Sequence, residues 1–260
     1  SLTREGRTMS VEVERVVPYS GNGEDKGTQV RRMFNRIAGR YDLLNGMLSL
    51  GFDRGWRRKT VDSLRAIAPR RVLDIAAGTG DMALLLCRRL SPSVSVVAAD
   101  LSEEMMAVGR RKAAEAGLSD RIAFEQQDCM ALTYADASFD AVTVAFGVRN
   151  YADLERGLGE MYRVLRPGGG LRIIELSAPR RFPMKQLYGI YSSVFMPLVG
   201  GWFGLEKDAY RYLPASIRKM PQGEEMAALL RRQGFTDVRV RTFTGGVCTL
   251  YSATRPSSRG

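Results

Sequence analysis

The sequence contains no histidine, and this absence removes several kinds of catalytic site at once. Histidine is the side chain whose charge ordinarily changes near neutral pH, so the usual general base and histidine-dependent nucleophiles and metal sites are excluded. The three cysteines, Cys87, Cys129 and Cys248, are widely separated. They show neither metal-ligand spacing nor a disulfide framework, which is typical of a reducing compartment. We therefore expect no metal and a cytoplasmic location.

Long hydrophobic runs are also absent. The most apolar region, residues 188–203, is interrupted by Gly189, Pro197, Gly200 and Gly201, so no stretch reaches the length of a membrane span. We find no convincing signal peptide either. With 260 residues, 45% of them hydrophobic, the chain is long enough for one well-buried α/β domain and an accessory segment.

The chemistry that is present is organised around residues 71–81, RVLDIAAGTGD. A short apolar run carrying one acid, Asp74, leads into the small-residue turn AAGTG at residues 76–80. A helix-forming run, residues 82–90, follows. Strand, glycine turn and helix together open a Rossmann-like unit. Glycine is needed in the turn because a side chain would keep the backbone away from a ligand.

The second predicted strand, residues 94–99, decides between cofactors. It ends in Asp100, where an acid accepts hydrogen bonds from a ribose diol, and both NAD and S-adenosylmethionine carry that diol. Asp74 would repel a pyrophosphate but suits the sulfonium and ammonium of S-adenosylmethionine. A GxGxxG match through Ala83 is formal and weak, and no Walker A triplet is present. The motif favours S-adenosylmethionine, with a solvated Asp74 in a plain nucleotide-fold turn as the other interpretation.

Strands and helices alternate along the chain with short links. Besides the first unit, we expect strands at 94–99, 122–126, 139–145, 171–176, 235–242 and 247–254, and helices from residue 29, at 57–68, 103–116, 153–165 and 223–233. Ser102 is the expected N-cap of helix 103–116. This order predicts a Rossmann-like α/β fold with a seven-stranded, mostly parallel, doubly wound sheet and helices on both faces. Ligands of such sheets bind at the carboxyl ends of the strands, where Asp74, Asp100, Asp128 and Arg149 lie.

We expect one domain, residues 28–254. Residues 1–27 are polar and glycine-containing and predict a flexible tail, and residues 255–260 a second one. Residues 28–69 predict an N-terminal helical cap. Residues 178–222 break the alternation and are rich in Tyr, Phe, Met and Gly. They predict a helical insertion, either a lid over an apolar substrate or a helical pair that packs on the domain.

Four segments are similar to those of one enzyme family. They are Tyr41-Asp42, Asn45, Leu48-Ser49 and Trp56 in the N-terminal part, RVLRPGGGLRIIELS at 163–177, AFGVRN at 145–150 and GGVCTLYSA near the end. Over about residues 28–254 the chain resembles the ubiquinone/menaquinone biosynthesis C-methyltransferases, which are class I S-adenosylmethionine enzymes. It departs from their pattern with Arg166 in place of Lys, Asp53 in place of His, and Ala145 where some members have Ser.

The resemblance implies site residues as well as a fold. Thr79, Asp100, Asp128 and Cys129 would line the cofactor site, with Asp128 facing the adenine amino group and Cys129 a pocket wall rather than a nucleophile. The full set expected to bind S-adenosylmethionine is Asp74, Gly78, Thr79, Gly80, Asp100, Leu101, Asp128, Cys129 and Ala145. The expected catalytic residues are Arg149, Asn150 and Tyr41, and no metal takes part.

The implied reaction methylates a ring carbon of a polyprenylated hydroquinone. The ring has to be reduced, because a quinone is electrophilic, and its hydroxyl, with a pKa of about 10 as in tyrosine, has to lose a proton. Arg149 would stabilise the phenolate, Asn150 would orient the same oxygen, and Tyr41 would hydrogen-bond or stack on the ring. A strand-end ion pair for Arg149 and helix packing for Tyr41 are the alternative roles.

Demethylmenaquinol is the favoured substrate. The alternatives are the ubiquinone precursor 2-polyprenyl-6-methoxy-1,4-benzoquinol, another small aromatic, or a non-catalytic prenyl-lipid carrier. A nucleic-acid methyltransferase is disfavoured, because residues 146–150 read FGVRN where those enzymes commonly carry an Asn/Asp-Pro-Pro-aromatic turn. We therefore expect no nucleic-acid partner. A homodimer is left open.

Charge adds a prediction about location. The net charge is +11, and residues 1–71 hold 15 Lys/Arg against 8 Asp/Glu, whereas the remainder holds 24 against 20. A solvated basic face is one interpretation, and attraction to an anionic membrane surface or to a nucleic acid are the others. We expect peripheral association with the inner face of the cell membrane, through an apolar channel formed by residues 178–222 and the N-terminal helix. The basic groups proposed for it are Arg31, Arg32, Arg57, Arg58 and Lys59.

Overall fold

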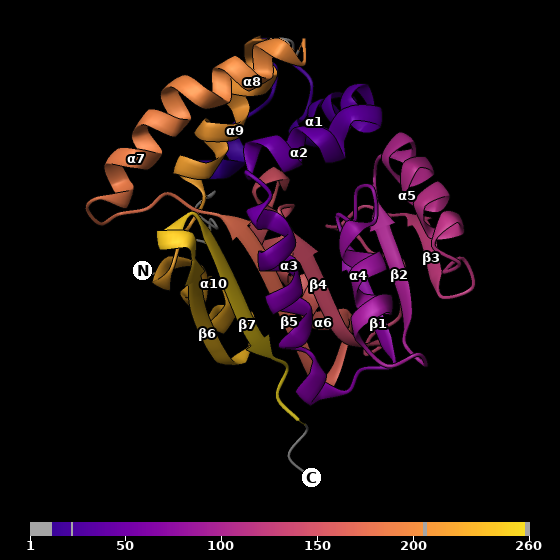
Figure 1. Cartoon of the computed structure of the whole chain (residues 1–260). Coiled ribbons are helices and arrows are strands. Elements are labelled where there is room, and N and C mark those ends of the chain that lie inside the picture. The colour runs from indigo at the N-terminus through magenta and orange to yellow at the C-terminus, as the bar shows by residue number, and fades with distance from the viewer. Residues whose placement is uncertain (1–11, 22, 205–206, 258–260) are drawn as a thin grey trace.

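A computed structural model describes residues 12–21, 23–204 and 207–257. Its centre is a seven-stranded sheet in the order β3-β2-β1-β4-β5-β7-β6 (Figure 1). Strands β1 to β5 run parallel, and β7 is antiparallel to both β5 and β6. The strands are β1 (Arg71–Ile75), β2 (Ser95–Asp100), β3 (Ile122–Gln126), β4 (Phe139–Ala145), β5 (Leu165–Leu176), β6 (Thr236–Phe243) and β7 (Cys248–Thr254). The predicted parallel sheet with a closing antiparallel hairpin is confirmed.

Helices cover both faces of this sheet. They are α1 (Lys26–Ile37), α2 (Tyr41–Leu48), α3 (Phe52–Asp62), α4 (Asp81–Arg89), α5 (Glu103–Glu115), α6 (Leu154–Val164), α7 (Met184–Ile190), α8 (Met196–Trp202), α9 (Lys207–Lys219) and α10 (Glu224–Arg232). Helices α3, α4 and α5 contribute to one hydrophobic core, and α6 and α10 to the other. The central strands are apolar because both of their faces are buried: in β1, Val72 packs into the first core and Leu73 and Ile75 into the second.

The turn after β1 requires glycine for two separate reasons. Gly78 and Gly80 have φ angles of +55° and +81°, in the left-handed region that favours glycine. A Cβ at Gly80 would also lie 3.0 Å from the Phe124 ring, where helix α5 and strand β3 press against the turn. The expected strand, turn and helix are therefore present, and the expected N-cap of α5 is confirmed, since the Ser102 hydroxyl accepts from the Met105 amide.

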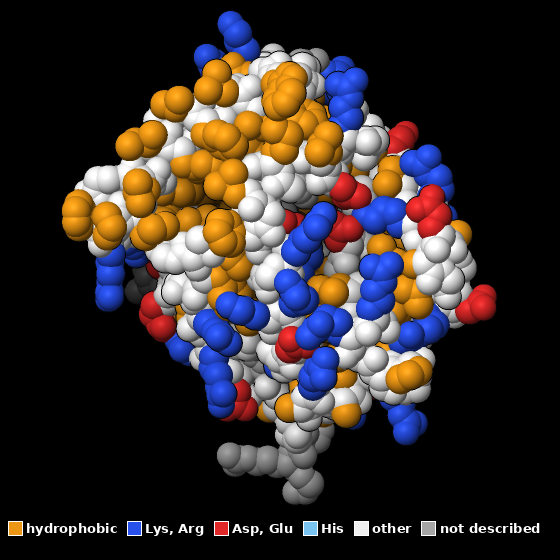
Figure 2. Space-filling model, in the orientation of Figure 1, with side chains coloured by type: hydrophobic (Ala, Val, Ile, Leu, Met, Phe, Trp, Pro, Cys, Tyr) orange, Lys and Arg blue, Asp and Glu red, His pale blue; other side chains and the backbone are white. Residues whose placement is uncertain are grey.

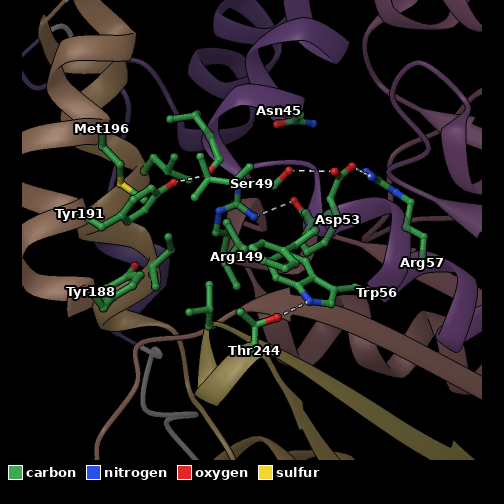
Figure 3. A pocket seen from close by; sticks show the side chains of 18 of the residues that line it. Asn45, Ser49, Asp53, Trp56, Arg57, Arg149, Tyr188, Tyr191, Met196 and Thr244 are labelled. Carbon is green, nitrogen blue, oxygen red and sulfur yellow. Dashed lines mark hydrogen bonds and ion pairs between the residues drawn. The ribbon is translucent and has the colours of Figure 1, made fainter. Parts of the chain in front are cut away.

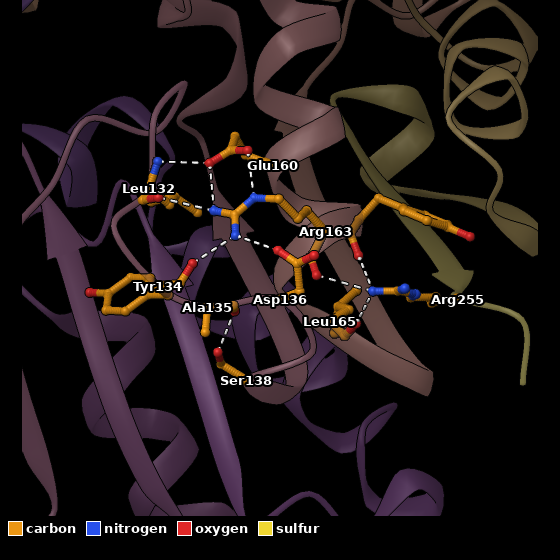
Figure 4. A network of polar contacts seen from close by, with 10 residues as sticks. Leu132, Tyr134, Ala135, Asp136, Ser138, Glu160, Arg163, Leu165 and Arg255 are labelled. Atoms are coloured by element: carbon orange, nitrogen blue, oxygen red, sulfur yellow. Dashed lines mark hydrogen bonds and ion pairs between the residues drawn. The ribbon is translucent and has the colours of Figure 1, made fainter. Parts of the chain in front are cut away.

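A network of polar contacts holds the chain at the amino-terminal end of β4 (Figure 4). The Arg163 guanidinium donates to the Glu160 and Asp136 carboxylates and to backbone carbonyls of the segment that precedes β4. Arg255 donates to the carbonyls of Tyr162, Arg163 and Leu165. These bonds satisfy carbonyls at the end of α6 that have no intrahelical partner. They are structural, because they lie away from the carboxyl ends of the strands.

The remaining helices form a layer over the carboxyl ends of the strands (Figure 1). Helices α1 and α2 come from the N-terminal cap, and α7, α8 and α9 from the insertion after β5. Between α7 and α8 the backbone passes through a π-helical segment, Tyr191–Phe195, a feature often found at functional sites. None of the helices in the described ranges is both long enough and apolar enough to cross a membrane.

The N-terminal region differs from the prediction in two respects. Helix α1 begins at Lys26, three residues earlier than expected, because the Asp25 carboxylate caps the Thr28 amide. Residues 12–21 and 23–25 do not form a free tail: Val13 is fully buried, and the Lys26 ammonium donates to the carbonyls of Val13 and Arg149. The polar composition of this N-terminal segment gave no sign of the packing, because the contacts that hold it come from one buried valine and one lysine. Residues 1–11 of the expected tail lie outside the described residues.

Helix α3 differs as well. It spans Phe52–Asp62, whereas the basic run was expected to be helical over residues 57–68. Gly51, with φ +77°, starts it, and a short 3-10 turn, Arg65–Ile67, follows its end. The start at Phe52 has a functional consequence, because it brings Asp53 and Trp56 into the layer above the sheet.

Candidate active site

Two cavities lie side by side at the carboxyl ends of the strands. The first, here called the acidic cavity, has a volume of about 80 Å³. It is lined by Gly27, Val30, Arg31, Phe34, Ala76, Asp100, Leu101, Ser102, Asp128, Cys129, Met130, Gly147, Asn150, Tyr151 and Ala152. Four of the residues expected to bind the cofactor are among them: Asp100, Leu101, Asp128 and Cys129. The parallel strands β2 and β3 end next to each other, and this places the four together.

Asp100 is held in position by the backbone. Its carboxylate accepts from the amides of Gly78 (2.8 Å) and Ser102 (2.8 Å), so the glycine turn and the start of α5 both orient it. Burial raises the pKa of Asp100, and these amides oppose the rise. A cationic or hydroxyl-bearing ligand in the cavity would restore solvation that the carboxylate has lost.

Cys129 and Asp128 form the far wall of the acidic cavity. Asp128 accepts from the Met130 amide (2.9 Å), which fixes the turn after β3. Burial raises the pKa of the Cys129 thiol to about 12. Because the thiolate is the reactive form, Cys129 is a neutral residue of the cavity wall.

Asp74 lies below the glycine turn and is almost fully buried. One carboxylate oxygen accepts from the Thr143 hydroxyl (2.6 Å), because Asp74 and Thr143 are paired across β1 and β4. The other oxygen, Oδ2, has no hydrogen-bond partner in the described part of the chain. Burial raises the pKa of Asp74 to about 7, against the effect of Thr143. A buried acceptor of this kind has room in its hydrogen bonding for a ligand group or a water molecule.

Three other expected cofactor residues are placed differently. The Thr79 hydroxyl donates to the Asp42 carboxylate, on the side of the turn away from the acidic cavity. Gly80 faces the Phe124 ring, and Ala145 packs against the core that contains α3 and α4. None of these three residues lines the acidic cavity. A role of these three residues in cofactor binding stays a prediction. Gly78 remains at the site through the bond from its amide to Asp100.

The second cavity, here called the apolar pocket, has a volume of about 250 Å³ and a mostly hydrocarbon wall (Figure 3). It is lined by Tyr41, Asn45, Leu48, Ser49, Leu50, Phe52, Asp53, Trp56, Arg57, Phe146, Arg149, Leu176, Met184, Leu187, Tyr188, Tyr191, Met196, Leu213, Ile217, Thr244 and Val247. Helices α2 and α3 form one side and the insertion the other. The Tyr191 hydroxyl donates to the Leu48 carbonyl and joins the two sides.

Arg149 is the buried cation of the apolar pocket. Its Nη1 donates to Glu175 Oε1 (2.7 Å) and to the Phe146 carbonyl (2.8 Å), whereas Nε has no partner in the described residues. Burial alone would lower the pKa of Arg149, but the Glu175 carboxylate raises it, so the guanidinium stays charged. Both roles considered for Arg149 are thus present: it forms a strand-end ion pair and it lines the pocket.

Glu175 lies on β5, and sequence reasoning did not assign it a role. An acid within the apolar run of β5 was the available signal, because a buried carboxylate needs a partner.

Tyr41 and the loop after β4 separate the two cavities. Tyr41 lines the apolar pocket, yet its ring lies 3.9 Å from the position that a Cβ on Gly78 would occupy. Within the loop, Phe146 and Arg149 face the apolar pocket and Gly147 and Asn150 the acidic cavity. A single loop therefore contributes to both cavities.

Asn150 and Arg149 do not share a cavity, contrary to the expectation that they orient the same oxygen. The Asn150 side chain accepts from the Tyr212 hydroxyl (2.8 Å), a buried group of α9 that sequence reasoning missed. Consecutive residues of a 3-10 turn, Val148–Asn150, point in different directions, and this separates them.

Among the described residues that line the apolar pocket, Asp53 is the only carboxylate. It accepts from the Ser49 hydroxyl (2.7 Å) and forms an ion pair with Arg57. Arg57 was expected among basic groups facing a membrane, and this is wrong, because the side chain is buried against Asp53 and the Phe146 ring. The (i, i+4) spacing on α3 brings the two together.

The apolar pocket has a mouth that opens to solvent. Three of its lining residues are strongly exposed: Leu50 (63%), Phe52 (52%) and Leu187 (56%). An apolar side chain that both lines a cavity and faces water marks the place where the cavity opens. Beyond the mouth, the exposed side chains of Ile190, Val194, Leu198 and Trp202 continue along α7 and α8.

Comparison with known proteins gives a consistent picture. The family model described as the ubiE/COQ5 methyltransferase family matches residues 22–255. A demethylmenaquinone methyltransferase of Bacteroides fragilis is 49% identical over 247 residues, which are 95% of this chain and 100% of the relative. The ubiquinone/menaquinone biosynthesis C-methyltransferase UbiE of Geobacter sulfurreducens is 46% identical, over 88% of this chain and 89% of its own.

Solved structures agree at the level of the fold. A phosphoethanolamine N-methyltransferase 2 of Haemonchus contortus, in complex with S-adenosyl-L-methionine, has a TM-score of 0.65. The alignment covers 91% of this chain and 61% of that one, at 16% sequence identity. At that identity the likeness concerns the architecture alone.

Proposed function

The chain belongs to the ubiE/COQ5 methyltransferase family, and from this premise we propose that it methylates a ring carbon of a polyprenylated hydroquinone, with demethylmenaquinol as the substrate. The methyl donor is S-adenosylmethionine. One observation carries the proposal: the loop at residues 146–150 and Tyr41 lie between an acidic cavity and an apolar pocket, so that two ligands of opposite character meet at one partition.

The residues of the acidic cavity fit S-adenosylmethionine. The oriented Asp100 carboxylate suits a ribose diol, and Asp128 lies on the wall where a base would extend. Asp74 lies beneath the cavity and does not line it, and its unpartnered Oδ2 suits an ammonium. When bound, this cofactor supplies an electrophilic methyl group. The protein contributes fixed carboxylates and a glycine turn, with no side chain in the way at Gly78.

The roof of the acidic cavity is helix α1. At about 80 Å³ the cavity is smaller than the roughly 300–1,000 Å³ of typical ligand sites. Gly27, Val30, Arg31 and Phe34 cover it, and Lys26 ties the start of the helix to the Arg149 carbonyl. We infer that α1 moves to admit the cofactor and afterwards excludes water.

Arg149 activates the hydroquinone. Its guanidinium is fixed by Glu175 and presents an unpaired Nε in a pocket of low polarity, where it lowers the pKa of a ring hydroxyl by stabilising the phenolate. Arginine itself stays protonated, so it acts as an electrostatic partner and leaves the proton to another acceptor. Tyr41 positions the ring at the partition, and Asn150 with Tyr212 keeps the loop in place.

The polyprenyl tail occupies the apolar pocket and leaves through the mouth at Leu50, Phe52 and Leu187. Such a tail is insoluble in water, so the enzyme meets its substrate at a lipid surface. Figure 2 shows orange side chains gathered over the insertion, next to the hollow of the pocket. We propose peripheral association with the membrane through this face, with the insertion at residues 178–222 serving as the lid of the tail site.

The decisive experiment is a methyl-transfer assay with purified chain, labelled S-adenosylmethionine and two reduced substrates. Demethylmenaquinol should be methylated, and the ubiquinone precursor 2-polyprenyl-6-methoxy-1,4-benzoquinol serves as the competing substrate. A preference for the second would move the function to ubiquinone synthesis. Each substrate is also offered in oxidised form, which should not react. Equal rates for oxidised and reduced rings would contradict activation through a phenolate.

A further inference from the structure

A basic groove lies between α3 and α4, beside the apolar pocket. Its volume is about 580 Å³, and its rim carries Arg54 and Arg58 from α3 and Arg88 from α4. All three are exposed, and none has an ion-pair partner within the described ranges. Arg54 and Arg58 are one helical turn apart and share a face of α3. Like charges gathered in this way repel one another unless an anion lies between them.

The other charged residues of the basic groove, apart from Glu115, form ion pairs with one another. Lys112 forms ion pairs with both Asp42 (2.7 Å) and Asp81, and Arg57 pairs with Asp53. Of the remaining acidic residues, only Glu115 lines the groove in the part of the chain that the structure describes. Five positive and four negative side chains line the groove, and Lys112 is shared between two carboxylates, so the groove keeps a net charge of +1.

One buried cation also lines the basic groove. Arg57 lines both the basic groove and the apolar pocket, and its side chain is 8% exposed. Its Nη1 is used by Asp53, whereas its Nε is buried without a partner among the described residues. Guanidinium groups bind phosphate through two parallel N–H donors, and a cluster of them is a common phosphate site.

The position of the basic groove suggests which phosphate it meets. Helix α3 begins at Phe52, a residue of the mouth, and Arg54 follows within the same turn. In Figure 2 the blue side chains over α3 and α4 lie next to the apolar region of the insertion, on one face of the molecule. A face with apolar side chains at one end and arginines at the other matches the acyl region and the headgroup region of a bilayer surface.

We propose that the basic groove binds the phosphate groups of anionic phospholipids and so aligns the mouth of the apolar pocket with the membrane. The inference rests on the proposed function only for the purpose of that alignment. Phe52 and Leu187 enter the acyl region, while Arg54, Arg58 and Arg88 lie at the depth of the headgroups. A nucleic acid would meet the same arginines but would leave the adjoining apolar side chains exposed to water.

The test compares two variants of the full chain with the same change in charge. The groove variant carries Arg54→Gln, Arg58→Gln and Arg88→Gln. The matched control carries Arg70→Gln, Arg111→Gln and Arg156→Gln, three exposed arginines without ion pairs in the described ranges and outside the groove. Co-sedimentation is measured with phosphatidylglycerol vesicles and phosphatidylcholine vesicles at low and high salt, and thermal unfolding verifies that both variants fold.

The groove variant should bind phosphatidylglycerol vesicles at least tenfold more weakly than wild type, and the control less than threefold more weakly. The difference should shrink at high salt, because salt screens exposed charges. Equal losses in both variants would show that only the net charge matters and would overturn the proposal. Unchanged binding by the groove variant would also overturn it.

Inorganic phosphate separates a lipid site from a soluble one. Calorimetric binding of free phosphate that depends on the groove arginines, with vesicle binding that does not, would assign the groove to a soluble phosphate and overturn the lipid proposal. The experiment needs neither quinol nor methyl donor. A chain that fails to methylate demethylmenaquinol but binds vesicles through the groove would refute the proposed function and leave this inference standing.

Discussion

The acidic cavity and the apolar pocket share a wall but are built in different ways. The acidic cavity is formed by the short turns after β1, β2, β3 and β4 beneath helix α1, with backbone amides holding Asp100 at 2.8 Å on each side. The apolar pocket is formed by helices from two regions that are far apart in sequence, the N-terminal cap and the insertion after β5. Local motifs therefore specify the strand-end walls of the first cavity, whereas its α1 roof and the whole second cavity depend on long-range packing.

The two cavities also differ in the charge that they bury. The acidic cavity presents carboxylates, and Asp74 lies beneath it with an unmatched oxygen, whereas the apolar pocket presents the unmatched Nε of Arg149. One side is suited to a cation and the other to a developing anion. Since both charges meet at Tyr41 and the loop after β4, a change on one side of the partition should leave the other largely intact.

The largest effect is expected for Arg149→Ala. It removes the cation that stabilises the phenolate, and kcat should fall by about 10²–10³, the scale of one lost electrostatic donor in an active site. The affinity for S-adenosylmethionine should change little, because Arg149 does not line the acidic cavity. Steady-state kinetics and calorimetry measure the two quantities.

Removal of Arg149 leaves Glu175 buried without its partner, so loss of stability has to be separated from loss of chemistry. Arg149→Lys keeps the charge, and thermal unfolding of both variants provides the control. A variant that folds normally and retains wild-type kcat would exclude Arg149 from the reaction.

The next largest effect is expected for Asp100→Ala, in the acidic cavity. Asp100→Ala should weaken cofactor binding by roughly 1.5–3 kcal/mol, the usual worth of a hydrogen bond to a charged group. At saturating cofactor, kcat should stay near wild type, because Asp100 does not line the apolar pocket. Calorimetry and saturation kinetics measure this. An unchanged dissociation constant would mean that Asp100 does not hold the ribose.

The pH dependence of cofactor affinity should show whether the Asp74 carboxylate takes part in binding. Burial raises its pKa to about 7, so the carboxyl is protonated below pH 7 in the free protein and must lose the proton to meet an ammonium. Cofactor affinity should therefore fall as the pH drops below 7, by up to tenfold per unit, and level off above 7.

Calorimetry between pH 5.5 and 7 measures this slope, in a range where the cofactor amino group stays protonated. Asp74→Asn is the control, and its affinity should be low and nearly independent of pH. A wild-type affinity that is flat over this range would assign the unpartnered oxygen a purely structural role.

The smallest effect is expected at the mouth. Phe52→Ser should raise KM for the polyprenylated substrate about fivefold, since a half-exposed aromatic side chain loses part of its apolar contact. KM for a ring without a tail should not change. Val240→Ser, on exposed β6 away from the pocket, is the matched control. An equal rise of KM for both substrates would place Phe52 at the ring rather than at the tail.

The sequence by itself determined the sheet, its parallel order and most of the acidic cavity. The reason is physical: a buried parallel strand needs a continuous apolar run, its turn needs glycine, and a strand end places the next polar side chain at one common edge. Asp100, Asp128 and Cys129 could be assigned from these local rules and from family resemblance. Thr79 could not, because the rules do not say which way the hydroxyl of a turn residue points, and here it faces Asp42.

Only the tertiary structure decided which residues contact one another around the two cavities. Glu175 beside Arg149, Tyr212 beside Asn150 and the burial of Arg57 against Asp53 depend on contacts between elements, as does the burial of Val13 by a segment expected to be free. Composition records the charge of such residues but not their neighbours. By sequence alone, Arg57 is a basic surface residue. Once α3 packs against the loop after β4, it becomes a buried wall between the apolar pocket and the basic groove. A charge that is removed from water needs a counter-charge in the fold, and only the tertiary structure supplies it.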